Sequence, residues 1–186
     1  NITVNINNVS DVAPVFTSAP VFTVEEGNTT VGNIQATDVE NESITFTLGG
    51  DDAADFELTA AGALTFASAP DFETPADADT NNIYNILVTA TDTTNTRVQA
   101  ITITVTDAND ETPVLSVSTP YSVAENTTSV GTVSTTDADA NSTITYTLSG
   151  TDAAKFDINS ASGAISFASA PDFETPGSGA SSNAYS

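Results

Sequence analysis

The 186-residue sequence contains no cysteine, no histidine and no tryptophan, and its only basic side chains are Arg97 and Lys155. The absence of cysteine excludes disulfide bonds and thiolate metal sites, and without histidine as well any metal site must use oxygen ligands. The formal net charge is −23. The chain therefore has no basic face for nucleic acid, and anionic membrane surfaces repel it. No apolar run approaches the roughly 20 residues of a membrane-spanning helix, so we expect no membrane span in this sequence.

Apolar and polar residues alternate along much of the chain, which is typical of half-buried β-strands. The alternation is found in four stretches, at 2–6, 44–48, 84–90 and 98–106. Further strands are predicted at 15–24, interrupted by Pro20, and at 32–36. Turn signals recur about every 8 to 12 residues and helical periodicity is absent, so the sequence predicts an all-β fold of seven-stranded, antiparallel Greek-key sandwiches, as in immunoglobulin-like domains.

Two copies of one repeat account for nearly the whole sequence. The nine residues 67–75 recur unchanged at 168–176, which indicates a tandem array. We assign residues 1–11 to the last strand and linker of a preceding repeat, residues 12–110 to a complete repeat, and residues 111–186 to a partial one. The second copy lacks almost all of its last two strands, so we expect a window from a longer periodic protein. Either further chain or strands from another molecule would complete this copy.

The segment that joins the two copies, 107–113, is acidic. It places Asp107, Asp110 and Glu111 within a few residues of extended chain, with Asn109 among them. Two carboxylates about 4 Å apart repel each other by roughly 4 kcal/mol at an effective dielectric near 20. The segment therefore either stays solvated as an ordinary turn or closes around a cation. Oxygen ligands alone favour a hard cation such as calcium.

With these motifs in this order, the chain resembles the cadherin repeat over essentially its whole length. The segment 107–113 matches the family's DxNDNxP linker. Four further motifs match xEN, DxD, LDRE and AxD, at 125–126, 137–139, 71–73 and 90–92 respectively. In that family these residues bind Ca²⁺ between successive domains and stiffen the array. The resemblance therefore implies a calcium-binding protein.

The resemblance also implies which residues hold the ion at the joint between the copies. They are Glu26, Asp71 and Glu73 from the first repeat, Asp107, Asp110 and the backbone oxygen of Asn109 from the linker, and Asp137 and Asp139 from the second repeat. A weaker joint before the first repeat would use Asp11, Asp38, Glu40 and Asp92, and a third joint would use Glu125, Asp172 and Glu174. The sequence departs from the family pattern at Asn8, Ser10, Phe72 and Glu111, and the second copy lacks the AxD aspartate.

The functional prediction is a non-enzymatic module, because the sequence offers no Ser/His or Cys/His pair and no glycine-rich phosphate loop. Asp71 and Glu73 could be read as two glycosidase carboxylates, but they share one face of a strand and recur in both copies. We expect a calcium-rigidified spacer, extracellular or at the cell surface, in a large adhesin or filament, with neighbouring repeats as partners. The alternative is a direct adhesion module that binds a polysaccharide or another copy, by homophilic contact or strand complementation. The acidic, cysteine-free composition is typical of a bacterial surface or secreted protein.

Overall fold

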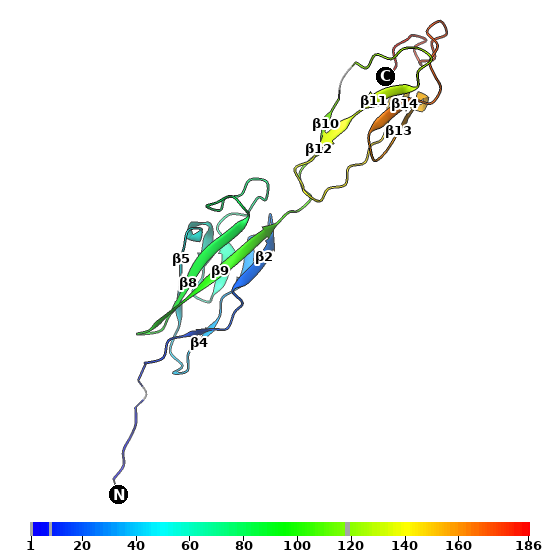
Figure 1. The fold of residues 1–186 in the computed structure, drawn as a ribbon. Coiled ribbons are helices and arrows are strands. Elements are labelled where there is room, and N and C mark those ends of the chain that lie inside the picture. The colour runs from blue at the N-terminus through cyan, green and yellow to red at the C-terminus, as the bar shows by residue number, and fades with distance from the viewer. Residues whose placement is uncertain (1, 8, 118–119) are drawn as a thin grey trace. The chain divides into compact units, whose positions relative to one another are not determined.

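The computed structural model describes residues 2–7, 9–117 and 120–186 and divides the chain into two compact units (Figure 1). Unit 1 is Asn1–Ala108 and unit 2 is Asn109–Ser186, so the division lies two residues before the predicted boundary after 110. The regular elements of the described part are β-strands and two short 3-10 turns, η1 (Ala53–Asp55) and η2 (Ala153–Lys155). The all-β prediction is therefore confirmed.

Unit 1 contains two main sheets. The larger sheet has the strand order β2–β9–β8–β5, formed by Val21–Glu25, Thr96–Thr106, Ile83–Thr91 and Thr45–Gly49. The smaller sheet has the order β3–β7–β6, formed by Thr30–Asn33, Ala63–Phe66 and Phe56–Leu58. A separate pair joins β1 (Val15–Phe16) to β4 (Ala36–Thr37).

The core of unit 1 lies between the two sheets, because successive residues of a strand point to opposite faces. In β8 the buried residues alternate along the whole strand with exposed or half-buried ones. Tyr84 is the largest fully buried side chain, and its ring meets Phe56 and Phe66 edge-on, at centroid distances of 5.5 and 5.1 Å. In β9, Ile101, Ile103 and Val105 complete the same cluster. The alternation read from the sequence thus identified the core face of both strands.

The predicted strand at 15–24 is two strands that join different sheets. β1 pairs with β4, whereas β2 runs parallel to β9, so the sandwich is not antiparallel at this pair. Pro20 has no N–H to donate, but its carbonyl oxygen accepts the N–H of Thr102 at 2.9 Å, just before β2 joins the larger sheet. The predicted strand at 32–36 is also divided, since Ile34 between β3 and β4 donates its N–H to the Gly62 oxygen at 2.7 Å.

Unit 2 repeats only part of this arrangement. Its strands are β10 (Val114–Ser116), β11 (Ser129–Thr132), β12 (Ser134–Thr136), β13 (Phe156–Ile158) and β14 (Ala164–Phe167). They form the sheets β10–β12 and β11–β14–β13. The described part of unit 2 has no counterpart of β8 or β9, and none of β5, which in unit 1 pairs with β8. Among its described hydrophobic residues, Val133 alone is buried, at 7% exposure.

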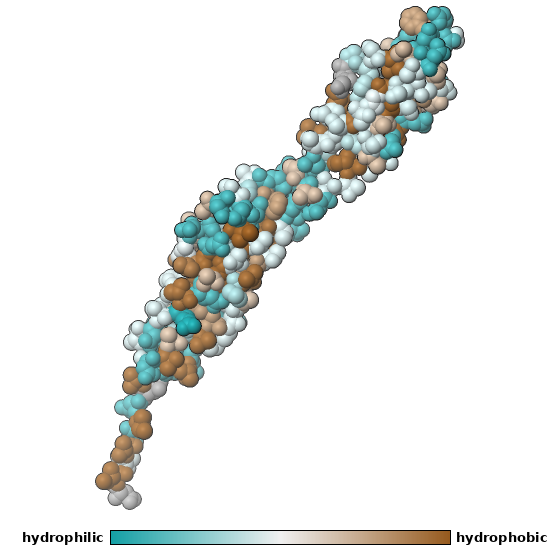
Figure 2. All heavy atoms as spheres, in the orientation of Figure 1, coloured by the Kyte–Doolittle hydropathy of each residue, from teal (hydrophilic) through white to brown (hydrophobic). Residues whose placement is uncertain are grey.

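The N-terminal segment 2–7 is extended but forms no strand, so the strand predicted at 2–6 is wrong for this structure. Ile2, Val4 and Ile6 are 94%, 77% and 95% exposed, and Figure 2 shows the hydrophobic residues along this segment. A strand requires a neighbour that satisfies its backbone groups, and nothing in the described part of the chain pairs with these residues. The segment has the alternating pattern of a strand, but the described part of the chain supplies no second strand that pairs with it.

Candidate metal centres

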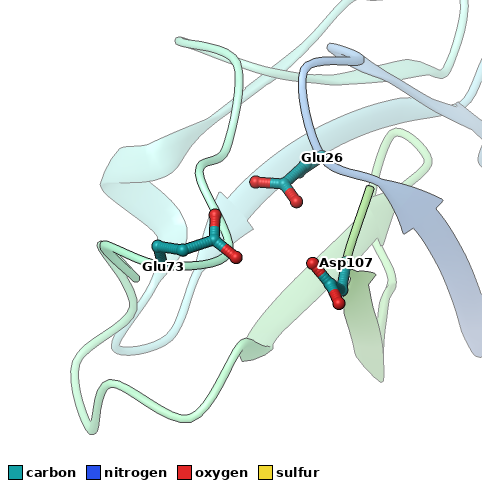
Figure 3. Close-up of side chains that lie close together, drawn as sticks. All are labelled: Glu26, Glu73 and Asp107. Atoms are coloured by element: carbon teal, nitrogen blue, oxygen red, sulfur yellow. The ribbon is translucent and has the colours of Figure 1, made fainter. Parts of the chain in front are cut away.

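Three carboxylates converge at the end of unit 1 where β9 finishes (Figure 3). Glu26 follows β2, Glu73 lies in the loop between β7 and β8, and Asp107 follows β9. One oxygen from each carboxylate lies within 4.8 Å of the others; Glu26 is buried, and Glu73 and Asp107 are half-buried. We call these three residues the Glu26 cluster. The family resemblance predicts all three at one joint, and the structure brings them together.

Backbone hydrogen bonds hold the Glu26 carboxylate in place. Its Oε2 accepts the N–H of Phe72 at 2.5 Å and its Oε1 accepts the N–H of Ala108 at 2.7 Å. The N–H of Glu26 itself donates to the Thr106 oxygen at 3.0 Å, in continuation of the β2–β9 pairing. Glu26 therefore ties the loop that carries Glu73 to the chain that carries Asp107.

The Glu26 cluster has the donor chemistry and spacing of a calcium site. Calcium takes carboxylate oxygens at about 2.3–2.6 Å, so two ligands of one ion lie at most roughly 5 Å apart. The observed limit of 4.8 Å satisfies that condition. Arg97 and Lys155 are the only basic residues in the sequence, and Arg97 pairs with Ala90, toward the opposite end of β9 from Asp107. The donor chemistry and spacing of the cluster therefore fit a calcium ion.

Asp71 lies on the same loop, so the strand face predicted to hold both Asp71 and Glu73 is wrong, and the Asp71 carboxylate is outside the cluster. Its Oδ1 accepts the N–H of Thr74 at 2.9 Å, and the residue is exposed. The equivalent loop of unit 2 repeats this local geometry, with Asp172 Oδ1 accepting the N–H of Thr175 at 3.2 Å and Glu125 Oε2 accepting the N–H of Phe173 at 3.1 Å. Glu125, Asp172 and Glu174 form a second group of carboxylates within 4.8 Å, and all three are exposed.

The opposite end of unit 1 carries the other predicted ligands. Asp92 follows β8 and is only 6% exposed, with its Oδ1 accepting the N–H groups of Thr94 and Asn95 at 2.7 and 2.6 Å. Asp38 Oδ1 accepts the N–H of Glu40 at 2.7 Å. The second oxygens, Asp38 Oδ2 and Asp92 Oδ2, are buried and have no hydrogen-bond partner in the described structure. Buried polar atoms nearly always have partners. Among the described residues, however, the four predicted ligands at this end form no group of three carboxylates within 4.8 Å of one another.

The pKa values at this end reflect the same crowding of acids. Desolvation raises the pKa of Glu40, and a hydrogen bond shared with the Asp11 carboxyl and repulsion from Asp38 act in the same direction. By contrast, the backbone N–H groups of Asn95 and Thr94 lower the pKa of Asp92 because they stabilise its charged form. The structure thus places the Glu40 carboxylate close to both Asp11 and Asp38.

Sequence reasoning missed a hydroxyl network beside these acids. Ser10 Oγ donates to Glu42 Oε2 at 2.6 Å and lies 2.7 Å from Thr94 Oγ1, and Thr93 Oγ1 donates to the same Glu42 oxygen at 3.1 Å. In the sequence Ser10 is only a departure from the linker pattern, whereas in the structure it ties the linker to the loop after Asp92. Asn8, the other departure in that linker, lies outside the described residues.

In unit 2 the predicted ligands lie near its first residues. Asp139 is buried and accepts the N–H of Glu111 at 3.1 Å through Oδ2, while its own N–H donates to Asp137 Oδ1 at 3.2 Å. Carboxylate oxygens of Asp110 and Asp139 lie within 4.8 Å of each other. Asn109 and Asp110 are exposed. The linker and the 137–139 turn are therefore joined within unit 2 itself.

Comparison with known proteins shows what these two units are similar to. No protein-family model matches the sequence. The Fat-like cadherin-related tumor suppressor homolog of Drosophila melanogaster is 32% identical over 186 residues, which cover 94% of this chain and 4% of that protein. Protocadherin Fat 1 of Homo sapiens is 38% identical over 144 residues, 71% of this chain and 3% of that protein. The crystal structure of mouse cadherin-23 EC22-24 has a TM-score of 0.69 and 27% identity, covering 88% of this chain and 56% of that one.

The two units are cadherin-like repeats. Repeats of this kind are extracellular, adhesion-related modules, and they generally bind calcium. The chain spans 4% or less of the length of the two Fat relatives, which are animal proteins, so a bacterial origin stays a prediction. No helix in the described part of the chain is long and apolar enough to cross a membrane.

Proposed function

We propose that this chain is a calcium-rigidified, extracellular spacer within a large cell-surface adhesin or filament, and not an enzyme. The observation that supports the proposal most directly is the Glu26 cluster, three carboxylates held within 4.8 Å in a chain with two basic residues. At the other end of unit 1, the buried oxygens of Asp38 and Asp92 are candidate ligands, but the acids there do not converge as those of the Glu26 cluster do.

The spacer function follows from where the acidic residues lie in the chain. Asp107 is the last acid of unit 1 and Asp110 the first of unit 2, so their Cα atoms are at most roughly 11 Å apart whatever the orientation of the units. A calcium ion would supply positive charge to these carboxylates. Without that charge, repulsion among Glu26, Glu73 and Asp107 favours arrangements that separate them. The joint is therefore flexible when apo and fixed when its acids are neutralised.

A calcium titration of the chain, read by thermal unfolding after treatment with a chelator, tests the binding. Extracellular sites bind calcium with Kd of about 10⁻⁴–10⁻³ M. A ligand that binds only the native state at about 100 times its Kd stabilises it by roughly 2.7 kcal/mol. We expect the unfolding temperature of unit 1 to be several degrees higher in about 10 mM calcium. Sodium chloride at the same ionic strength should have no such effect. An unfolding temperature that is independent of calcium would refute the proposal.

Small-angle scattering tests the mechanical part of the function separately. We expect calcium to narrow the distribution of distances and increase the maximum dimension, because a fixed joint removes bent arrangements. If calcium binds but this distribution is the same with and without chelator, the chain binds calcium without being a calcium-stiffened spacer.

Direct adhesion is the second candidate, and one feature of unit 1 favours it. Val21, Ile83, Leu87 and Val98 are exposed hydrophobic residues on the outer face of the sheet β2–β9–β8–β5. Such a face suits contact with another copy. If it serves adhesion, sedimentation will show concentration-dependent association, and the double substitution Leu87→Thr with Val98→Thr, which keeps the β-propensity high, will weaken it.

A further inference from the structure

Asn82 carries a buried amide beside the Glu26 cluster. The residue directly precedes β8, it is only 8% exposed, and its backbone has a φ of +64°, a left-handed conformation that asparagine tolerates better than most residues. Its Nδ2 donates to the Phe72 oxygen at 2.9 Å, whereas its Oδ1 is buried and has no hydrogen-bond partner in the described structure. Burying an unpartnered oxygen costs free energy, so stability alone explains this side chain poorly.

The carbonyl group that Asn82 holds belongs to the peptide bond between Phe72 and Glu73. The Phe72 N–H donates to Glu26 Oε2 at 2.5 Å and the Phe72 oxygen accepts from Asn82, so both backbone polar groups of Phe72 are held. Glu73 follows directly in the chain and belongs to the Glu26 cluster. Because the direction of this peptide bond decides where the Glu73 side chain begins, Asn82 constrains Glu73 through the backbone of Phe72.

Asn82 also holds the segment that carries Asp107. Its backbone oxygen accepts the N–H of Val105, two residues before Asp107, at 2.9 Å. One residue thus joins the loop of Glu73 to the end of β9. Glu26 makes a similar connection, but its carboxylate adds to the repulsion within the cluster. The Asn82 amide is neutral, so it holds the two segments together without adding charge.

The same pair of hydrogen bonds recurs in unit 2. Asn183 Nδ2 donates to the Phe173 oxygen at 3.0 Å, and the Phe173 N–H donates to Glu125 Oε2 at 3.1 Å. Glu174 follows Phe173 in the chain, and it belongs with Glu125 and Asp172 to the second group of carboxylates. In both units an asparagine amide therefore holds the peptide bond that precedes the equivalent glutamate.

We propose that Asn82 is a positioning residue for the cation of the Glu26 cluster. Through its Nδ2 it holds the Phe72 carbonyl group and so keeps a Glu73 oxygen within 4.8 Å of the other two carboxylates. This inference rests on the proposed function, because it requires that calcium binds the cluster. The amide holds the ligands in place before the ion binds, which reduces the ordering that binding requires. Removing outer-shell partners of this kind typically weakens metal binding about 10- to 100-fold.

Three variants of the full chain test the role of this side chain. Asn82→Gly removes the amide alone, because glycine suits the φ of +64° and the backbone bonds to Asp77 and Val105 are kept. Thr80→Gly is the matched control, since Thr80 is exposed in the same loop at a φ of +54°. Asn82→Asp keeps the shape but replaces the Nδ2 donor by an acceptor. A carboxylate would improve a cation ligand but cannot donate to the Phe72 oxygen, so this variant distinguishes a ligand from a positioning residue.

The calcium Kd is measured from the NMR signals of the Glu73 and Ala108 amides while the chelator-treated chain is titrated with calcium chloride. We expect Asn82→Gly to raise this Kd about 10- to 100-fold, Asn82→Asp to raise it as well, and Thr80→Gly to leave it near the native value. In chelator, we expect Asn82→Gly to reduce the hydrogen-exchange protection of the Phe72 amide. Its unfolding temperature in chelator should stay close to that of Thr80→Gly.

The outcomes separate this inference from the proposed function. If the native chain binds calcium and Asn82→Gly binds it with the native Kd, this inference alone is overturned. Tighter binding by Asn82→Asp would overturn it too, because the residue would then be a ligand. An unfolding temperature of Asn82→Gly in chelator far below that of Thr80→Gly would reveal an ordinary structural contact and would likewise overturn it. If calcium does not shift the Glu73 amide signal of the native chain, the proposed function fails, and this inference fails with it.

Discussion

Replacing Glu73 by glutamine should change the stability of unit 1 in opposite directions with and without calcium. The substitution keeps the shape and one oxygen ligand but removes one charge from the Glu26 cluster. In chelator, where the three carboxylates repel one another, the variant should be more stable than the native chain. In calcium, where they would serve as ligands, it should be less stable.

The distances in the cluster set the size of the effect. Two unit charges 4.8 Å apart repel by about 3.5 kcal/mol at an effective dielectric of 20. Because Glu73 is half-exposed, solvent screening reduces this to about 1–2 kcal/mol. A change of 1 kcal/mol shifts the unfolding temperature of a domain of this size by roughly 4–8 °C. We therefore expect an increase of about 5–10 °C in chelator.

With calcium at about 100 times its Kd, the native chain gains roughly 2.7 kcal/mol from each filled site. The variant should lose most of this gain, so its unfolding temperature should fall below that of the native chain. Scanning calorimetry in the two conditions measures both changes. Glu57→Gln is the control, since Glu57 is exposed on β6 and the substitution removes the same charge outside the cluster. Equal responses of the two variants, or a lower unfolding temperature of Glu73→Gln in chelator, would refute the reasoning.

Three further predictions concern stability. Phe66→Ala should lower the free energy of unfolding of unit 1 by about 3–5 kcal/mol, whereas Phe167→Ala should lower that of unit 2 clearly less because Phe167 is only half-buried. Separate calorimetric transitions of the two units would measure both losses, and equal losses would contradict the prediction. Gly62→Ala should destabilise unit 1 by more than 1 kcal/mol in chemical denaturation, because the backbone there has a φ of +88° and a Cβ would lie 2.1 Å from the Ile34 oxygen. Gly27→Ala is the control and should destabilise unit 1 less, because its φ is +72° but its Cβ would lie in open space. The backbone N–H groups of Gly179 and Ser186 lower the pKa of Asp152 below its ordinary value of 3.8. The contribution of Asp152 to the stability of unit 2 is therefore complete above that pH and is lost as the pH falls through the lower folded-state pKa. Asp152→Asn should flatten this acid dependence of unit 2 unfolding, and an unchanged profile would contradict the prediction.

The acidic residues of unit 1 show how far a site can be predicted from sequence. Glu26, Glu73 and Asp107 were assigned to one joint through the family resemblance, and the structure brings their carboxylates together. Asp52 and Asp77 were not singled out, yet both are buried. Asp52 accepts the N–H groups of Ala78 and Asn85 at 2.8 and 2.6 Å. The aspartate recurs as Asp152 in the second copy, which is a signal that could have revealed its structural role.

The sequence by itself determined the repeat, the β class and the core-facing residues, because alternation and self-similarity are local properties of the chain. It could not show that 15–24 divides between two sheets, since that depends on which neighbours satisfy the backbone of β2. Nor could it show that the Asp71 carboxylate accepts the N–H of Thr74 within its own loop, whereas the Glu73 carboxylate belongs to the Glu26 cluster. The segment 2–7 makes the same point most directly: its pattern is that of β9, but whether a strand forms is decided by a partner for its backbone groups, which only tertiary structure supplies.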